Sequence, residues 1–341
     1  MATLWTKERL DILKAYLEGG LSYSEIAPKF KVSPDSIEKT VKRYALNKFK
    51  KIDKDIPVLD LDELDDSNFE EQKAAAKLQW KVPTTKVPAN GKKSFKTYVV
   101  VTDVHVPEQN TAAVNCVLQV MKDIRFDGIL NLGDFVDLAV VSHWNKSKHK
   151  TLEGKRLKSD YIAGNALLDE FDKLLPKDAD KRFFKGNHCQ WIDDLVEEIP
   201  ALDGLFDIES GLKLIERGYK VYPYNHIERI GRLCLTHGMY ANANTVKKHL
   251  DELKVNIMIG HGHQIEQRMA SSAAREISLA GYEVGCLTNL DPDYAKHRAN
   301  CHTHGFAIVY FYPNGYFDVN LIRIIAGKCI VRGIEYDGNK K

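Results

Sequence analysis

The segment YVVVTDVH, residues 98–105, runs from a short apolar stretch directly into Asp103 and His105, two residue types that bind metals. Later segments repeat this arrangement, and stretches of this length are typical of buried strands. The five stretches, each with the polar residues that follow it, are Tyr98–Thr102 with Asp103 and His105, Gly128–Asn131 with Asp134 and Asp137, Arg182–Phe184 with Asn187 and His188, Arg232–Thr236 with His237, and Asn256–Ile259 with His261 and His263. They predict five strands whose ends carry polar residues.

Helices are expected between these strands, in Asn115–Ile124, Tyr161–Leu175 and Thr245–Leu253. Alternating strands and helices predict an α/β, or layered α+β, domain. Further on, Phe306–Tyr312 and Tyr316–Ile324 flank a short turn and predict a β-hairpin. Because ligands bind outside the carboxyl ends of strands in such sheets, we expect the five polar groups to meet in one place.

The residue types at these strand ends indicate a particular chemistry. Carboxylate and amide oxygens together with imidazole nitrogens suit manganese first, with iron, zinc, nickel or cobalt as alternatives. Two such divalent ions about 3.5–4 Å apart can activate water and stabilise both oxygens of an in-line phosphoryl displacement. The sequence therefore predicts a two-metal phosphoric ester hydrolase.

Taken in order, the five motifs resemble the calcineurin-like metallophosphoesterases, over roughly residues 97–325. The resemblance implies a β-sandwich flanked by helices. It also implies a ligand set for two ions: Asp103, His105 and His263 for the first, Asn187, His237 and His261 for the second, and Asp134 as a bridge between them. His188 would be the catalytic histidine, and Asp137 would orient it.

The sequence departs from the serine/threonine phosphatases of that superfamily at two places. Leu138-Ala139 stands where those enzymes carry Arg-Gly, and Cys189 stands where they carry Glu. The arginine that would clamp a phosphomonoester is therefore missing. The stretches around Pro200, Val221 and Gly285 instead resemble a phage-and-prophage branch of the superfamily.

A second resemblance concerns residues 1–50. Ser22 or Ser24 and then Ser33 can cap short helices, and Pro34 suits a first helical turn. The segment 20–37 is similar to the helix-turn-helix of resolvase-like and regulator proteins. By that resemblance a third helix would enter the major groove of DNA, and a protein-docking role is the alternative. The candidate DNA contacts there are Ser36, Lys39, Thr40, Lys42 and Arg43.

Composition sets the remaining expectations. We expect a charged linker at 51–96, the metallophosphoesterase domain at 97–330 and a C-terminal tail at 331–341. The six cysteines are scattered, which suits a reduced compartment. No apolar stretch approaches the roughly 18 residues of a membrane span, so we expect no membrane partner and a cytoplasmic protein, which for a phage gene means the cytoplasm of the host. The oligomeric state stays open.

A basic cluster follows the second metal motif. Residues 146–158 hold six Lys or Arg against one acid, Glu153. The default reading is a solvated loop, and the alternative is contact with a phosphate backbone through Lys150, Lys155, Arg156 and Lys158. Together with the N-terminal module this favours a DNA-directed phosphodiesterase, that is, a nuclease. The alternatives are a phosphatase or phosphodiesterase of small molecules or nucleotides, and a DNA-associated regulator with vestigial activity.

Overall fold

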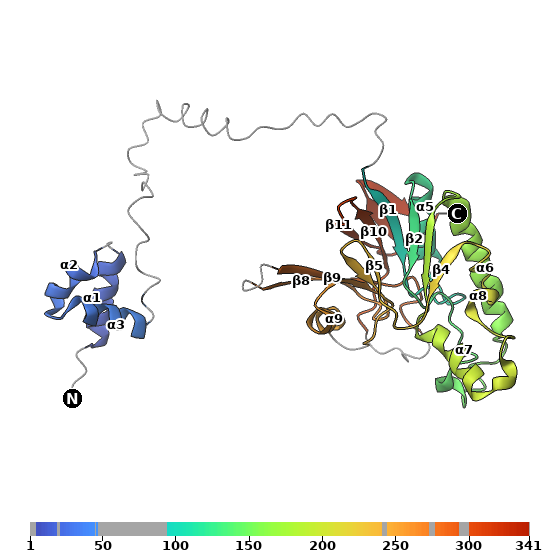
Figure 1. The fold of residues 1–341 in the computed structure, drawn as a ribbon, viewed down its shortest axis with the longest axis horizontal. Coiled ribbons are helices and arrows are strands. Elements are labelled where there is room, and N and C mark those ends of the chain that lie inside the picture. Colours follow the sequence, from blue (N-terminus) through green and yellow to red (C-terminus); the bar gives the residue numbers. More distant parts are fainter. Residues whose placement is uncertain are drawn as a thin grey trace, which may run out of the picture. The chain divides into compact units, whose positions relative to one another are not determined.

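The computed structural model describes residues 5–18, 21–44, 46, 94–240, 244–272, 277–292 and 300–340. The chain divides into two compact units, Met1–Ala89 and Asn90–Lys341. The predicted charged linker at 51–96 lies outside the described residues, apart from 94–96. Each unit is described by itself below (Figure 1).

The described part of the N-terminal unit holds three helices, α1 (Lys7–Glu18), α2 (Tyr23–Phe30) and α3 (Pro34–Arg43). The sequence starts α2 with a capping box, in which Ser22 accepts from the backbone of Glu25 and Glu25 accepts from the backbone of Ser22. Ser33 caps α3 more simply, because its side chain accepts from the backbone N–H of Ser36 and no reciprocal bond is formed. Apolar side chains of all three helices then share one core, made by Leu13, Leu17, Ile26, Ala27, Phe30, Ile37 and Val41.

A six-stranded sheet forms one half of the C-terminal unit, in the order β11-β10-β1-β2-β3-β4. Neighbours from β1 to β4 are parallel, whereas β10 is antiparallel to β1. The strands are β1 (Lys96–Val101), β2 (Gly128–Asn131), β3 (Asp180–Phe184), β4 (Tyr219–Tyr222), β10 (Gly305–Phe311) and β11 (Phe317–Arg323). The predicted hairpin is the β10–β11 pair.

A five-stranded sheet forms the other half, in the order β5-β6-β7-β9-β8. Its strands are β5 (Glu228–Ile230), β6 (Leu233–Leu235), β7 (Asn256–Ile259), β8 (Ile265–Ser272) and β9 (Ile277–Val284). Because β6 and β7 are parallel, His237 and the pair His261 and His263 follow strand ends at the same edge of this sheet.

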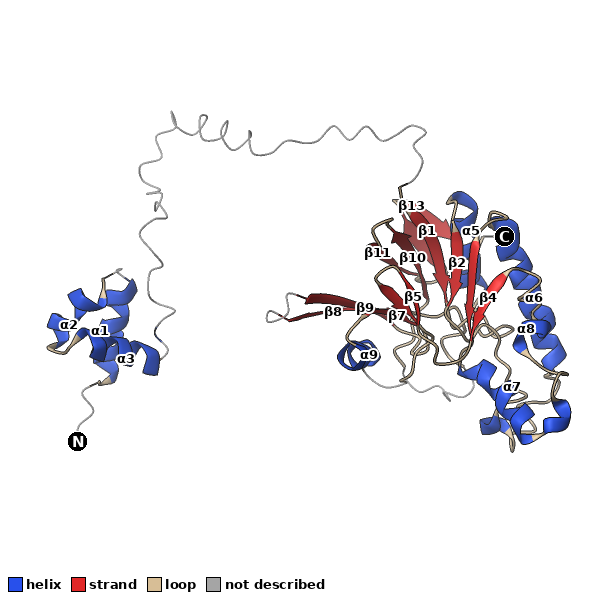
Figure 2. Ribbon diagram, viewed as in Figure 1, coloured by secondary structure: helices blue, strands red, loops and turns tan. Residues whose placement is uncertain are grey.

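The two sheets pack face to face with helices outside them (Figure 2). Side chains alternate along β1, so Val100 joins Met258 of the second sheet in the core between the sheets. Its neighbour Val101 faces the other way, toward a core shared with Phe171. The helices are α5 (Thr111–Asp123), α6 (Leu157–Leu174), α7 (Asn187–Glu198), α8 (Ile208–Gly211), α9 (Thr245–Leu253) and the short 3-10 turns η3 (His143–Asn145) and η4 (Pro200–Leu202). The predicted α/β β-sandwich flanked by helices is confirmed.

The end of the chain differs from the predicted tail at 331–341. β12 (Lys328–Val331) and β13 (Ile334–Asp337) form a hairpin. Cys329, Val331 and Tyr336 are buried in the core beside α5, and Asn115 of α5 donates to the carbonyl of Gly338 at 3.0 Å. Residues 331–340 are therefore an integral part of the C-terminal unit. The sequence signal was weak, because Cys329, Ile330 and Val331 form a continuous apolar run and not an alternation.

Replacing Tyr336 by alanine tests that packing. The Tyr336 side chain is 5% exposed, so we expect Tyr336→Ala to lower the free energy of unfolding by about 3 kcal/mol, the usual size for a buried aromatic. Ile334→Ala is the matched control, because Ile334 is 53% exposed on the same strand. Denaturant unfolding of both variants is the measurement. Equal stability of the two variants would mean that the hairpin is not packed as described.

Candidate metal centre

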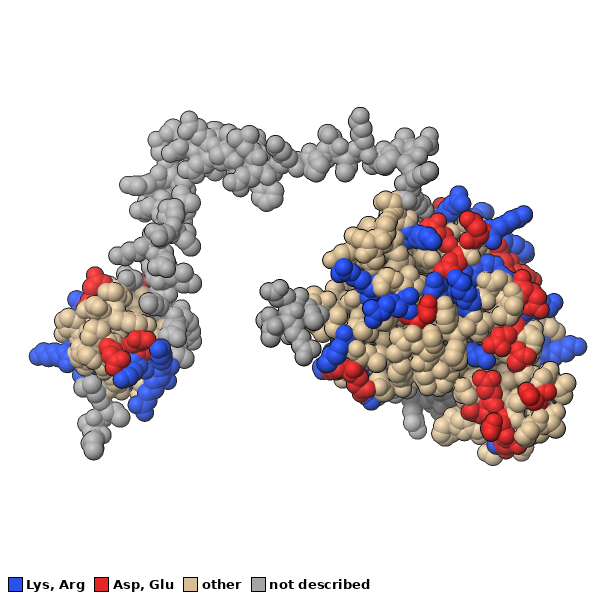
Figure 3. All heavy atoms as spheres, in the orientation of Figure 1, with Lys and Arg blue, Asp and Glu red and all other residues tan. Residues whose placement is uncertain are grey.

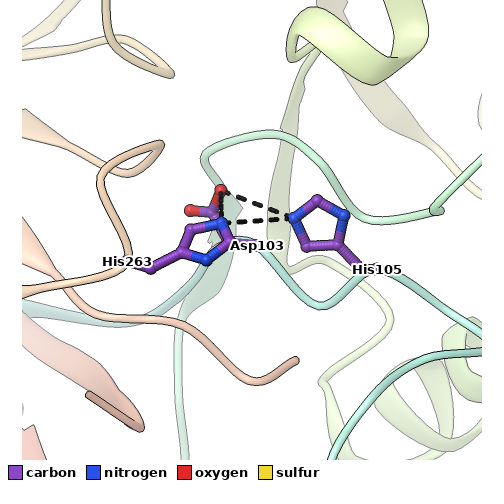
Figure 4. Close-up of side chains that lie close together, drawn as sticks. All are labelled: Asp103, His105 and His263. Carbon is purple, nitrogen blue, oxygen red and sulfur yellow. Dashed lines mark hydrogen bonds and ion pairs between the residues drawn. The ribbon is translucent and has the colours of Figure 1, made fainter. Parts of the chain in front are cut away.

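The first cluster brings together Asp103, His105 and His263, whose ligand atoms all lie within 4.8 Å of one another (Figure 4). Asp103 and His105 follow β1, and His263 follows β7, so one residue comes from the second sheet. The Nε2 of His263 lies 3.2 Å from Asp103 Oδ1. It also lies 3.3 Å from the Nε2 of His105. Three electron-pair donors therefore point at one another.

The second cluster brings together Asp134, His237 and His261. His237 donates from Nδ1 to the carbonyl of Leu132 at 2.8 Å, which in the neutral ring leaves the lone pair on Nε2. That Nε2 lies 3.2 Å from Asp134 Oδ2 and 3.1 Å from Asn187 Oδ1. In that neutral form the facing atoms are all acceptors. Burial lowers the pKa of His237, but attraction to Asp134 outweighs burial and raises it to about 9, so an ion at Nε2 would replace a proton.

A divalent cation fits both clusters. Asp103 Oδ1 is fully buried and has no hydrogen-bond partner among the described residues, which is costly for a carboxylate oxygen unless a cation takes that place. Carboxylate, imidazole and amide donors suit a borderline or hard divalent ion. The second-cluster residues that would hold an ion include Asn187, whose amide oxygen faces His237. The two clusters adjoin, because the backbone N–H of His261 donates to Asp103 Oδ2 at 2.9 Å.

The electrostatics of the clusters also favour a cation. Burial alone would raise the pKa of Asp134, but attraction to the rings of His237 and His188 outweighs burial and lowers that pKa well below its ordinary value. Burial, with repulsion from His237, lowers the pKa of His261 to about 4. At neutral pH the carboxylate is therefore charged and the His261 ring is neutral, which are the forms that bind metal.

Backbone strain is concentrated at the same positions. Five of the candidate metal ligands adopt positive φ although they are not glycine. This conformation costs roughly 1–3 kcal/mol for each residue and is often found at functional sites. The five residues are Asp103, His105, Asp134, His261 and His263, with φ between 47° and 70°. The sharp turn after each strand aims the side chain into the shared site.

Two glycines allow the loops to approach so closely. A Cβ on Gly186 would lie 2.0 Å from Asp134 Oδ1, and one on Gly260 would lie 2.0 Å from Thr102 Oγ1. Both positions lie immediately before a candidate ligand, Asn187 and His261. A side chain at either place would push the loop away from the opposing carboxylate.

His188, predicted to be catalytic, lies at the start of α7 and forms a third group of possible metal ligands with His105 and Asp137. Its Nε2 is 3.9 Å from Asp134 Oδ2, and its ring is 4.5 Å from that of His105. Its Nδ1 contacts the backbone carbonyl of Asp137 at 2.5 Å. The carboxylate of Asp137 lies nearer the Nδ1 of His105, at 3.4 Å, than that of His188, at 3.8 Å. Asp137 thus meets His188 chiefly through its main chain, which differs from the predicted carboxylate contact.

An open cavity of about 740 Å³ adjoins the first cluster and His188. Its lining includes Trp144 and Lys148 from the segment after the second motif, Trp191 from α7, and Asn289 from the loop after β9. Trp191 packs on the His188 ring with centroids 3.9 Å apart. The sequence analysis missed Trp191, although its i, i+3 spacing from His188 would have placed both on one helix face.

The candidate DNA contacts in the basic cluster have different surroundings. Lys155 is partly buried, lines the cavity and pairs with Glu108 at 2.8 Å. Lys150, Arg156 and Lys158 are exposed. Lys146 is also paired, with Glu198. The expectation of a solvated loop therefore describes most of this segment.

On α3, four of the five candidate contacts are at least partly accessible. Lys39 and Lys42 are exposed and pair with Asp35 and Glu38, both at 2.7 Å. Thr40 is the exception, and its prediction as an exposed contact is wrong. It is 5% exposed and donates to the Ser36 carbonyl at 2.7 Å, because its position on α3 faces the helical core.

Comparison with known proteins gives two kinds of similarity. Residues 6–49 match the model of the homeodomain-like domain family, which confirms a helix-turn-helix type of domain at the N-terminus. Over 253 residues, 70% of this chain and 97% of the relative, the sequence is 23% identical to the gene 54 protein of Mycobacterium phage L5.

Solved structures similar to the chain include a Vps29 single mutant from Entamoeba histolytica and a metallophosphoesterase from Sphaerobacter thermophilus. The first is 15% identical, with a TM-score of 0.37, over 71% of this chain and 98% of that chain. The second is 16% identical, with a TM-score of 0.37, over 67% of this chain and 88% of that chain. Because these sequence identities and TM-scores are low, the function is inferred from the geometry of the site. Among the described helices, none is long and apolar enough to span a membrane.

Replacing Asp134 by alanine tests the metal centre. Asp134 faces His237 and is the predicted bridge between the ions. Asp134→Ala should therefore remove most of the bound metal from both sites and not merely weaken one of them. Elemental analysis of protein loaded with Mn²⁺ and then desalted is the measurement. The matched control is Asp251→Ala, an exposed aspartate on α9, which should retain the wild-type metal content. Equal metal content in both variants would contradict the assigned site.

Proposed function

We propose that this chain is a two-metal phosphodiesterase that acts on DNA. The observation that supports the proposal best is the pair of adjoining clusters, each with facing electron-pair donors, beside a histidine and an open cavity. Divalent ions held there would supply an activated water and would neutralise the phosphate charge. The same geometry supports proposed roles for individual residues of the chain.

His188 is proposed to give a proton to the leaving oxygen. Its Nδ1 is held by the Asp137 carbonyl, so Nε2 is the atom that faces the clusters. Burial lowers the pKa of His188, while the carboxylates of Asp134 and Asp137 oppose that shift. The negative charge of a bound phosphodiester would further favour the protonated ring. Trp191 covers one face of the ring and fixes its orientation.

A phosphodiester is favoured over a phosphomonoester by the cavity. By the resemblance, Leu138-Ala139 stands where the serine/threonine phosphatases carry the Arg-Gly that would clamp a terminal phosphate, and Ala139 lines the cavity. The N-terminal match to a homeodomain-like domain supports DNA as the source of the diester. On the face shown in Figure 3 basic and acidic side chains of the C-terminal unit are interspersed, so DNA would be held by local clusters.

A small-molecule phosphodiesterase or nucleotidase is the second candidate. The cavity volume of about 740 Å³ lies within the range of small-molecule pockets, which supports this reading. The two candidates differ in the length of polyanion that they must hold. Their response to salt therefore separates them.

Replacing His188 by alanine tests the proposed proton donor. His188→Ala should slow hydrolysis of bis-p-nitrophenyl phosphate by about 10²–10⁴-fold, the usual contribution of general acid catalysis. The metal content should stay at the wild-type level, because His188 is not among the assigned ligands. The measurement is kcat together with elemental analysis. A rate within a few-fold of wild type would exclude the catalytic role.

A salt series tests DNA as the substrate. For a nuclease, the logarithm of affinity should fall with the logarithm of salt, with a slope near −0.9 per phosphate contact on duplex DNA. Replacing the exposed Lys150, Arg156 and Lys158 by alanine should flatten that slope by about one unit per lost contact. The control replaces Lys173, Lys247 and Lys328, exposed cations elsewhere in the unit, and should keep the wild-type slope. Rapid mononucleotide dephosphorylation without DNA cleavage at any salt would favour the second candidate.

A further inference from the structure

Trp144 is the most exposed large apolar side chain in the described part of the chain, at 70%. Large aromatic side chains usually bury most of their surface, because about 25 cal/mol is lost for each Å² left in water. This tryptophan nevertheless lines the cavity beside the metal centre. An exposed aromatic ring in such a place indicates a ligand that covers it.

The loop that carries Trp144 is held in place. Ser142, two residues before it, is buried. Asn145, directly after it, donates from its side chain to the carbonyl of Ala139 at 3.1 Å. Asn145 also accepts from the Lys148 amine at 2.8 Å. The ring is therefore presented on a fixed turn.

Aromatic rings connect Trp144 to the reaction centre. Its ring lies 4.3 Å from that of His143, and His143 lies 6.5 Å from Trp191. Trp191 in turn packs on His188 at 3.9 Å. Trp144, Trp191 and His188 line the cavity, whereas His143 contacts both tryptophan rings without lining it. We call Trp144 and Trp191 the aromatic wall.

We infer that the aromatic wall stacks an unpaired nucleobase of the substrate, with Trp144 as its exposed platform. This inference rests on the proposed function, since the phosphate joined to that nucleoside would lie at the metal centre. Base–aromatic stacking accepts every base, so the wall would hold a nucleotide without reading sequence. Lys148 lines the same cavity and carries a positive charge that suits an adjoining phosphate, whereas Lys155 is paired there with Glu108.

The wall also sets the form of nucleic acid. A base inside a duplex is already stacked on its neighbours and cannot cover Trp144 unless it is flipped out. The substrate at this site is therefore single-stranded, or locally unpaired at an end or a flap.

Binding of matched oligonucleotides by the full-length protein tests this inference. A fluorescent single-stranded DNA is compared with one of equal length and charge whose central positions are abasic. The divalent metals are chelated, so that no cleavage occurs, and affinity is measured by fluorescence anisotropy. Wild type should prefer the strand with bases by roughly 5- to 150-fold, the range that stacking on one ring supplies.

The variants make the outcome specific. In Trp144→Ala the preference should fall close to one, Trp144→Phe should keep most of it, and Trp144→Leu should lose it because bulk without aromaticity cannot stack. Tyr316→Ala is the matched control, since Tyr316 is also exposed, at 52%, but lies outside the cavity. It should keep the wild-type preference.

Two outcomes would overturn the inference. One is that Trp144→Ala keeps the wild-type preference for the strand with bases over the abasic strand. The other is that Trp144→Ala lowers affinity for fully paired duplex as much as for the single strand. The assay reads binding alone, so its failure is distinct from failure of the proposed function. Absence of diester hydrolysis by the metal-loaded wild type would show the latter.

Discussion

Buried electron-pair donors that face one another constrain this structure more than any other feature. Asp103 Oδ1 is sealed from water and has no hydrogen-bond partner among the described residues, while the imidazole nitrogens of His105 and His263 converge on the same point. Removing such groups from water is unfavourable unless a positive charge compensates. A pair of divalent ions would satisfy both clusters at once, and the surrounding loops are shaped to permit this.

The rest of the fold can be understood as support for that arrangement. Two sheets present parallel strand ends at a common edge, so ligands separated by up to 160 residues meet without long loops. Left-handed conformations at Asp103 and Asp134 cost free energy. The apolar core between the sheets, with Val100 and Met258 among its fully buried members, offsets that cost. The rigid scaffold thus holds these residues in backbone conformations that would be unfavourable in isolation.

Much of this could be predicted from the sequence, for a physical reason. An apolar stretch followed directly by Asp103 or His237 combines a strand signal with a ligand type, and repetition along the chain makes coincidence improbable. The C-terminal hairpin was missed because Ile330 and Ile334 are exposed, which weakens the apolar pattern there. The contact between Asp137 and His105 depends on side-chain direction, and the exposure of Trp144 depends on tertiary packing. Neither can be obtained from spacing alone.

The central claim is that two ions occupy the two clusters together. Anomalous diffraction at the manganese absorption edge, from crystals of the full-length protein grown with Mn²⁺, tests it most directly. The account predicts two peaks about 3.5–4 Å apart, one among Asp103, His105 and His263 and the other among Asn187, His237 and His261, with Asp134 between them. A single peak, or peaks away from these residues at saturating Mn²⁺, would contradict it.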